Sequence, residues 1–165
     1  MLKLKTWIED SPKTPLFWVA LLRIMLGLLF LTQWYDNLIN GIYTEEGLNG
    51  LFEYFFSTSD MPLEWYMDFI HELVMPITPA FAVFQLVAEL FIGLAFIFGF
   101  LTPLVSLGAA FFILNTFFLS YGADWPWSYL TILSILGVLF FTRAGRVIGV
   151  DAWLMERAGD RFPLW

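Results

Sequence analysis

The sequence contains no cysteine and only one histidine, His71. Without cysteine the chain cannot form a disulfide, offer a thiolate nucleophile, hold an iron-sulfur cluster by thiolates or carry a dithiol redox pair. A single histidine also rules out bis-histidine haem ligation within the chain. We therefore expect no haem, iron-sulfur cluster or metal ion in this chain, and any redox centre would be a bound quinone or would lie on another subunit.

Basic residues are also scarce. Lys and Arg number 8 against 15 Asp and Glu, which gives a net charge of -7. Because nucleic-acid binding depends on clusters of basic residues against phosphates, this balance argues against a nucleic-acid partner. The sequence also has no Gly-rich phosphate loop, no Ser/His/Asp set and no zinc-ligand spacing.

Apolar residues, in contrast, dominate the chain. Of its 165 residues 59% are hydrophobic, 20% are aromatic and only 14% are charged, more apolar surface than a soluble domain of this length can bury. Four apolar runs, each of about the length that crosses a hydrocarbon core of roughly 30 Å, stand out. They are residues 15–39, 79–101, 103–121 and 125–142. The sequence predicts an all-α fold: an integral membrane four-helix bundle that forms a single domain over residues 1–165.

Two segments outside these runs have an amphipathic pattern. The first, residues 40–78, has apolar side chains at helical spacing in two groups, and we expect two short helices that lie on the membrane surface or cap the bundle. The groups are Leu48, Leu51, Phe52 and Phe55, then Leu63, Tyr66, Phe69, Ile70 and Leu73. The second segment, the tail 143–165, suits one interfacial helix with Asp151 as its N-cap.

The basic residues predict the orientation in the membrane. Those outside the spans either precede the first run or follow the fourth, and the loop 40–78 has none. The first group is Lys3, Lys5 and Lys13, and the second is Arg143, Arg146, Arg157 and Arg161. By the positive-inside rule, we expect a multi-pass protein of the cell membrane with both termini in the cytoplasm and the acidic loop outside.

Glu89 lies in the middle of the second apolar run, and Arg23 is the only basic residue in any of the four runs. Charged side chains at such depth are costly and are usually paired and functional. Measured along ideal helices, Arg23 and Glu89 lie at depths that one arginine side chain can bridge. We expect these two residues to pair and to form a candidate catalytic site.

Gln85 and Asn115 lie at similar depth and complete a predicted polar cluster with Arg23 and Glu89. The cluster has two interpretations. It can be a proton or quinone site, in which Gln85 and Asn115 help to bind the quinone, or a buried ion pair that fixes the helix register.

Two weaker candidates lie toward the outer surface. Trp34, Tyr35 and Asp36 close the first run, where aromatic residues usually form an interfacial belt, although a stacked quinone or small anion would use Trp34 and Asp36 in the same way. A second set shares one helical face and can be a divalent-cation site or, more commonly, a solvated acidic face. That set is Glu64, Asp68, His71 and Glu72.

Three stretches resemble the DoxX/DoxD-like family of membrane proteins. They are LLRIMLGLLFLTQ at 21–33, AELFIGLAFIFGFLTPLVSLGA at 88–109 and AGRVIGVDAWL at 144–154. The resemblance covers nearly the whole chain and is greatest to the DoxD type, the membrane subunit of thiosulfate:quinone oxidoreductase. It implies a four-helix protein that, with a DoxA-like partner, oxidises thiosulfate to tetrathionate and passes the electrons to quinone.

The chain departs from this family at the end of the first run. Many relatives have Gly-x-x-Lys there, whereas this chain has Gln33, Trp34, Tyr35 and Asp36, and we expect the DoxA-like partner to be a separate chain. Two classes of function remain open. The protein can be the quinone-facing subunit of such an oxidoreductase, surrounded by membrane lipids, or a non-catalytic accessory subunit of a larger membrane complex.

Overall fold

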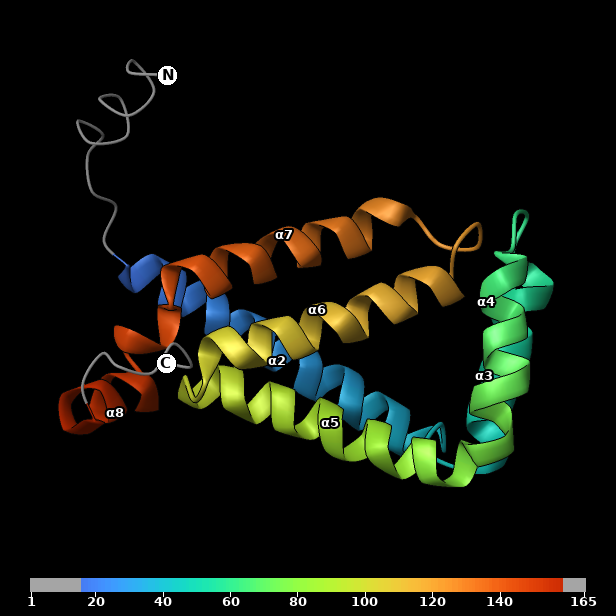
Figure 1. The fold of residues 1–165 in the computed structure, drawn as a ribbon, viewed down its shortest axis with the longest axis horizontal. Coiled ribbons are helices and arrows are strands. Elements are labelled where there is room, and N and C mark those ends of the chain that lie inside the picture. Colours follow the sequence, from blue (N-terminus) through green and yellow to red (C-terminus); the bar gives the residue numbers. More distant parts are fainter. Residues whose placement is uncertain (1–15, 159–165) are drawn as a thin grey trace, which may run out of the picture.

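The computed structural model describes residues 16–158, and in this part of the chain every regular element is a helix. Four helices run along the long axis of the molecule (Figure 1). They are α2 (Phe17–Ile39), α5 (Thr78–Phe98), α6 (Thr102–Leu119) and α7 (Pro126–Thr142). The predicted all-α class is confirmed, whereas Lys3, Lys5, Lys13 and Arg161 lie outside the described residues.

The helices have the length and composition of membrane spans. Among the described residues, three helical segments are long and apolar enough to cross a bilayer: Phe17–Ile39, Glu64–Phe98 and Thr102–Leu119. Helix α7 is apolar but shorter, with 17 residues. The protein is therefore an all-α membrane protein.

The four long helices pack as two pairs. The most extensive contacts join α2 to α5 and α6 to α7, and further contacts of α5 with α6 and of α2 with α7 hold the pairs together. Helices α2 and α5 approach closely at Gly27 and Gly93, where a Cβ on Gly27 would lie 2.9 Å from the carbonyl oxygen of Gly93. The apolar core between the pairs includes Leu26, Phe30, Ile92, Phe96, Val105, Ala109, Leu136 and Leu139.

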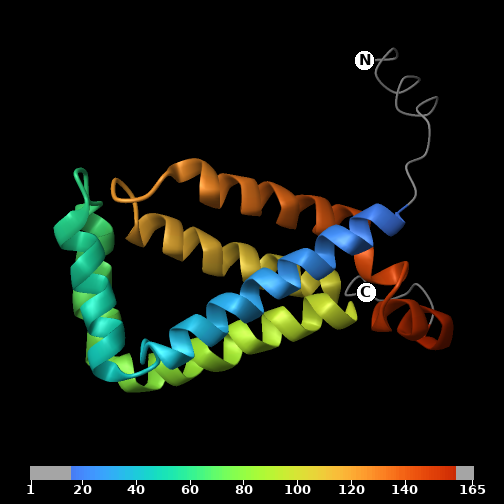
Figure 2. The same cartoon turned by 180° about the vertical axis from the view of Figure 1, so that it is seen from behind.

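Two further helices, α3 (Glu45–Thr58) and α4 (Glu64–Phe69), lie across one end of the bundle (Figures 1 and 2). We call this the α3 end. Helix α3 begins at Thr44, whose hydroxyl oxygen accepts a hydrogen bond from Gly47 N at 3.0 Å. A second core lies beneath the two helices and contains Leu48, Phe52, Phe56, Tyr66, Ile70, Val74, Ala82 and Leu119. The predicted amphipathic helices therefore cap the bundle, although Phe69 and Leu73 are 40% and 62% exposed and lie outside this core.

The second of these helices is not separate from the span that follows it. Helix α4 continues through a π-helical turn, Ile70–Val74, and a 3-10 turn, Met75–Ile77, directly into α5. Pro76 and Pro79 account for this irregular stretch, because each proline lacks an N–H and its ring clashes with the carbonyl one turn earlier. The segment changes direction here (Figure 1).

The opposite end of the bundle, where α2 begins and α7 ends, carries α8 (Val150–Ala158), and we call it the α8 end (Figure 2). Helix α5 stops at Phe98, earlier than the predicted boundary at Leu101. It stops there because Gly99 adopts a left-handed conformation with φ +65°, and Leu101 also has a positive φ of 49° before α6 begins. This tight turn makes α5 and α6 a hairpin.

The cap should depend on Phe52, which is 4% exposed in the core beneath α3. We expect Phe52→Ala to lower the free energy of unfolding by about 3–5 kcal/mol, because it leaves a cavity in that core. Urea unfolding of the protein in detergent micelles measures this change. Tyr54→Ala is the matched control, since Tyr54 lies on the same helix with 59% of its surface exposed, and an equal loss in the two variants would contradict the packing described here.

Candidate functional site

Glu89 is buried near the α3 end of the bundle, with 1% of its surface exposed. Its carboxylate accepts three sets of hydrogen bonds, all from uncharged groups. The Tyr43 hydroxyl donates to Oε2 at 2.5 Å, the Asn37 amide donates to Oε2 at 3.2 Å, and the Gln85 amide donates to Oε1 at 3.1 Å. We refer to Glu89, Tyr43, Asn37 and Gln85 as the Glu89 cluster.

Three elements bring the Glu89 cluster together. Gln85 precedes Glu89 by four residues on α5, so the two side chains share a helix face. Asn37 lies in the last turn of α2, and Tyr43 lies in the turn between α2 and α3. The exposed Gln33 extends the cluster outward, since its amide donates to Asn37 Oδ1 at 3.0 Å.

Tyr43 is held in its protonated form. It lies outside the spans, and burial together with the neighbouring Glu89 carboxylate raises the pKa of its hydroxyl well above the usual value. The hydroxyl therefore remains a hydrogen-bond donor at neutral pH. Glu89 is thus surrounded by donors that add no charge, and Arg23 makes none of these contacts.

Arg23 lies at the other end of the bundle, with none of its surface exposed. Its guanidinium donates to the backbone oxygens of Ala144, at 3.0 Å, and Ile148, at 2.5 Å. Both acceptors belong to the segment between α7 and α8, which includes the 3-10 turn Ala144–Arg146. The buried acidic side chain at this end of the bundle is Asp151, not Glu89.

Asp151 is also fully buried, and it joins α8 to the hairpin. Its carboxylate accepts from Leu101 N at 2.6 Å and from Thr102 N at 2.8 Å, so it caps the start of α6 rather than its own helix as predicted. In return, Asp151 N donates to the carbonyl oxygen of Gly99 at 2.9 Å. Arg23 and Asp151 together form what we call the Arg23 cluster.

Glycines make room for the Arg23 cluster. A Cβ on Gly149 would lie 2.8 Å from Arg23 Nη1 and 3.0 Å from the Cα of Gly99, while a Cβ on Gly145 would collide with the Asp151 carboxylate. The sequence GRVIGVD at 145–151 therefore has a packing role. Its two glycines and its aspartate allow the segment between α7 and α8, which we call the exit segment, to lie against the α5–α6 turn and against Arg23.

The predicted pairing of Arg23 with Glu89 is wrong. In a helix each Cα–Cβ bond tilts toward the helix N-terminus. Helices α2 and α5 are antiparallel, so the Arg23 side chain leans toward the α8 end and the Glu89 side chain leans toward the α3 end. The prediction rested on the depths of the Cα atoms alone, which do not include the direction of the side chains. Because the two side chains lean toward opposite ends of the bundle, their charged groups are separated and each has its own hydrogen-bond partners.

The remaining predicted site residues are divided among different places. Gln85 joins Glu89 as expected, but Asn115 does not, because its side chain accepts a hydrogen bond from Tyr66 at 3.2 Å and donates to the Phe111 backbone at 2.7 Å. Trp34 is half-buried, and its indole N–H has no hydrogen-bond partner among the described residues. Asp36 is exposed on the last turn of α2.

The predicted acidic face with Glu64, Asp68, His71 and Glu72 does not bring these side chains together as the ligands of a metal ion. His71 Nε2 lies 3.0 Å from Glu53 Oε1, which links the π-helical turn to α3. Within residues 16–158 no group of three or more His, Asp and Glu side chains has the proximity needed to hold a metal ion.

The sequence analysis missed Asn37 and Tyr43 as partners of Glu89. Asn37 lies near the end of the first apolar run and Tyr43 lies just beyond it, whereas the prediction included only Trp34, Tyr35 and Asp36 there. A polar side chain one turn after Gln33 was the available signal, since Gln33 and Asn37 share a helix face. Tyr43 has no such periodic signal, because a turn places it.

The Glu89 cluster is suited to proton exchange. A buried carboxylate with only neutral donors around it can gain a proton without leaving an unpaired cation behind. Tyr43, half-buried at the α3 end, separates Glu89 from the surface there. The Arg23 cluster has no such freedom, because its guanidinium and carboxylate are both bound to backbone groups of neighbouring segments.

Comparison with known proteins identifies a family. The family model described as DoxX matches residues 18–122, from the start of α2 to the turn after α6. Both clusters draw on these residues, whereas Asp151 and the segment that binds Arg23 lie beyond them. No curated protein and no solved structure matches the chain.

Energetic independence of the two charges follows from this arrangement. The Arg23 guanidinium lies next to Gly99. Glu89 precedes Gly99 by ten residues, which is roughly 15 Å along α5, so the two charged groups are far apart. We expect Arg23→Met to cost about 3–5 kcal/mol, because it leaves Asp151 buried without its cation. Combined with Glu89→Gln, the two losses should add to within about 0.5 kcal/mol.

A double-mutant cycle of unfolding free energies in micelles measures this. Arg23→Met combined with Asp151→Asn is the matched control, and that pair should depart from additivity because the two charges interact. Strong coupling between Arg23 and Glu89, with none between Arg23 and Asp151, would contradict the assignment of separate clusters.

Proposed function

Because the chain belongs to the DoxX family of membrane proteins, we propose that it is the quinone-facing subunit of a complex that oxidises thiosulfate. Two thiosulfate ions would lose two electrons to give tetrathionate, and one quinone would take up these electrons and two protons to give the quinol. The observation that supports a role for this chain is Glu89, a buried carboxylate with three neutral donors and no basic partner.

Glu89 supplies a proton to the reduced quinone in this proposal. Quinone reduction needs protons as well as electrons, and a positioned carboxylic acid is a suitable donor. Tyr43 lies at the α3 end and offers a hydroxyl through which Glu89 can be reprotonated. The exposed Gln33 amide retains a second hydrogen after bonding to Asn37, and it can donate to the carbonyl of a quinone dissolved in the lipid.

The charge distribution supports the binding of thiosulfate by another subunit and not by this chain. No Lys or Arg occurs between Arg23 and Arg143, so the described residues of the α3 end include no Lys or Arg to bind thiosulfate. A DoxA-like partner would bind this anion and donate the electrons. The acidic surface of α3 and α4 would then face that partner, which we expect to be basic where it docks.

Two observations favour the second candidate, a non-catalytic accessory subunit of a larger membrane complex. Two surface hollows in the described part of the chain are lined by other side chains, and Glu89 does not line either of them. Large aromatic side chains also point away from the bundle on three helices. Phe84, Phe111 and Phe141 are 63%, 71% and 84% exposed, and they suit contacts with lipid or with neighbouring spans.

We also propose that the α8 end faces the cytoplasm of the cell. The basic residues Arg143, Arg146 and Arg157 follow α7 at this end, whereas the described residues of the α3 end include acidic side chains but no Lys or Arg. The positive-inside rule supports this orientation.

Substitution of Glu89 tests the proposed chemistry. We expect Glu89→Gln to leave a folded, partner-bound complex but to remove thiosulfate-dependent quinone reduction, because glutamine keeps the shape and accepts hydrogen bonds but cannot donate an acidic proton. Quinol formation in membranes that contain the complex is the measurement. Thr116→Val is the matched control, since the Thr116 hydroxyl bonds only to the backbone of α6 and lies outside the Glu89 cluster.

A Glu89→Gln complex that turns over at the unmodified rate would refute the catalytic role. Absence of any quinone reduction by the unmodified complex, with thiosulfate and every copurifying subunit present, would favour the accessory role instead.

Reporter fusions test the proposed orientation. At the C-terminus, a reporter that is active only in the cytoplasm should give a signal, because four spans return the chain to its starting side. At Ser59, in the turn between α3 and α4, only a reporter that is active outside the cytoplasm should give a signal. A cytoplasmic signal from the Ser59 insertion would refute the arrangement.

A further inference from the structure

An apolar hollow of about 250 Å³ lies on the surface of α5 at the α8 end. Three of its side chains follow one face of α5 at spacings of three and four residues, and they are 40% to 60% exposed. In a membrane protein such a face is turned toward lipid. All six side chains of the lining are apolar: Phe91, Leu94, Ala95, Phe98, Phe100 and Val150.

Helix α8 forms one side of this hollow. Val150, the first residue of α8, lines it. The next residue, Asp151, is bonded to the α5–α6 hairpin through both its backbone N–H and its carboxylate. These hydrogen bonds hold the start of α8 beside the end of α5 (Figure 1). Because the span formed by α5 ends here, the hollow lies close to the level at which the hydrocarbon core meets the lipid head groups.

Beyond the hollow, α8 has an aromatic ring and then a positive charge. Val150, Trp153 and Arg157 follow one another at spacings of three and four residues, so they share one helix face that is roughly 10 Å long. Trp153 is 49% exposed, and the Arg157 guanidinium carbon lies 4.2 Å from the centre of its ring. This cation–π contact uses the face of the guanidinium, so its in-plane N–H groups remain able to bind an anion.

The charges near α8 favour an anion. Among the described residues that follow α7, the arginines outnumber the acidic residues, and the carboxylate of one acidic residue is buried and bonded to backbone N–H groups. The surface at the α8 end is therefore net positive. The arginines are Arg143, Arg146 and Arg157, and the acidic residues are the buried Asp151 and the exposed Glu156.

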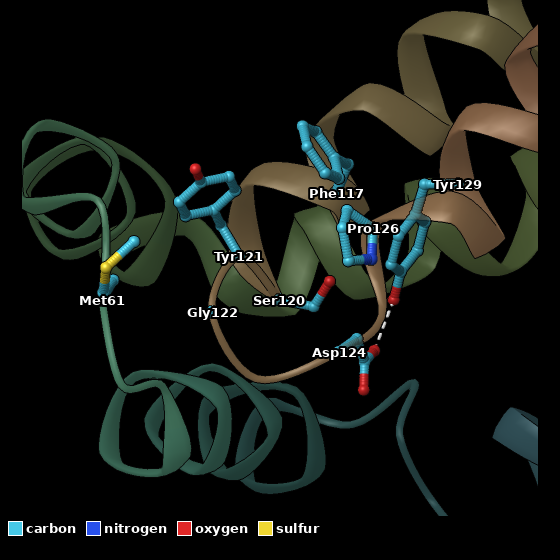
Figure 3. Close-up of a pocket in the computed structure, with 8 residues that line it drawn as sticks. All are labelled: Met61, Phe117, Ser120, Tyr121, Gly122, Asp124, Pro126 and Tyr129. Atoms are coloured by element: carbon cyan, nitrogen blue, oxygen red, sulfur yellow. Dashed lines mark hydrogen bonds between the residues drawn. The ribbon is translucent and has the colours of Figure 1, made fainter.

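A hollow at the α3 end has the opposite charge. Asp124 lines it and accepts a hydrogen bond from the Tyr129 hydroxyl at 2.6 Å (Figure 3). No Lys or Arg lies between Arg23 and Arg143 to neutralise this carboxylate. An amphiphilic anion is thus attracted to the hollow at the α8 end and repelled from the one at the α3 end.

We propose that the protein binds one anionic phospholipid at the α8 end. An acyl chain of the lipid occupies the apolar hollow, its ester region lies at Trp153, and its phosphate accepts hydrogen bonds from Arg157. The order of these groups along α8, from apolar to aromatic to cationic, is the order of the groups in a phospholipid from chain to phosphate. The net positive surface selects a head group without a compensating ammonium.

Native mass spectrometry of the full chain in detergent micelles tests the head-group selectivity, with phosphatidylglycerol and phosphatidylethanolamine of identical acyl chains as probes. We expect phosphatidylglycerol to bind about fivefold more tightly, which is the factor that one arginine near anionic head groups contributes. Arg157→Gln should abolish this preference. Glu156→Gln is the matched control, because it neutralises the adjacent exposed side chain of α8 and should leave the preference in place.

A second pair of variants tests the hollow. Leu94→Trp should weaken the binding of both lipids severalfold, because the larger side chain fills the space for the acyl chain. Leu107→Trp is the matched control, since Leu107 is 53% exposed on α6 and lies outside the hollow. Glycerophosphoglycerol, the head group without acyl chains, should not compete with phosphatidylglycerol.

Three results would overturn the proposal. They are equal binding of the two lipids, a preference for phosphatidylglycerol that Arg157→Gln leaves intact, and equal effects of the two tryptophan variants. Arg157 and Leu94 both have exposed side chains, so these substitutions leave the packed core of the bundle unchanged.

Discussion

Two charged side chains are buried in an apolar bundle, and each must find polar partners within the protein because lipid offers none. Glu89 takes its partners from α2, α5 and the turn at the α3 end, whereas Arg23 takes its partners from the segment after α7. This requirement fixes both ends of the molecule. At the α3 end, the hydrogen bond to Glu89 holds Tyr43, in the turn before α3, against α5. At the α8 end, the hydrogen bonds from Arg23 hold the segment between α7 and α8 against α2.

The two clusters differ in what their hydrogen bonds permit. Arg23 bonds to backbone oxygens, and Asp151 bonds to backbone N–H groups of the α5–α6 hairpin, so a change in either charge disturbs the chain path itself. Glu89 bonds to side chains of tyrosine, asparagine and glutamine, which can rotate to accept or donate as its protonation changes. One cluster is thus suited to structure and the other to chemistry, although the sequence predicted a single cluster that contained both Arg23 and Glu89.

The all-α membrane class and the DoxX resemblance could be predicted from the sequence, because the long apolar runs and the stretches around Arg23 and Glu89 are local signals, whereas the motif GRVIGVD lies beyond the residues that the family model matches. It also identified Glu89 and Gln85 as neighbours, since they lie four residues apart on one helix. It failed where the answer depended on side-chain direction or on turns. Arg23 and Glu89 diverge because their helices are antiparallel, Asn115 faces Tyr66 instead of Glu89, and Tyr43 reaches Glu89 only through the turn that follows α2.

The long sequence separation between Arg23 and its partners has a consequence for biosynthesis. The acceptors Ala144 and Ile148 follow Arg23 by 121 and 125 residues. The ribosome therefore completes α5, α6 and α7 before the arginine can bind these oxygens, and α2 enters the bilayer before them with a buried arginine, for which the cost is at most the roughly 2.5–3.5 kcal/mol of a helix centre. Until the exit segment emerges, that charge must be accommodated by water, lipid head groups or an insertion factor. A segment made after α7 thus supplies the partners of a side chain on α2, and a nascent chain that stops before Ala144 would retain an unsatisfied arginine in the membrane.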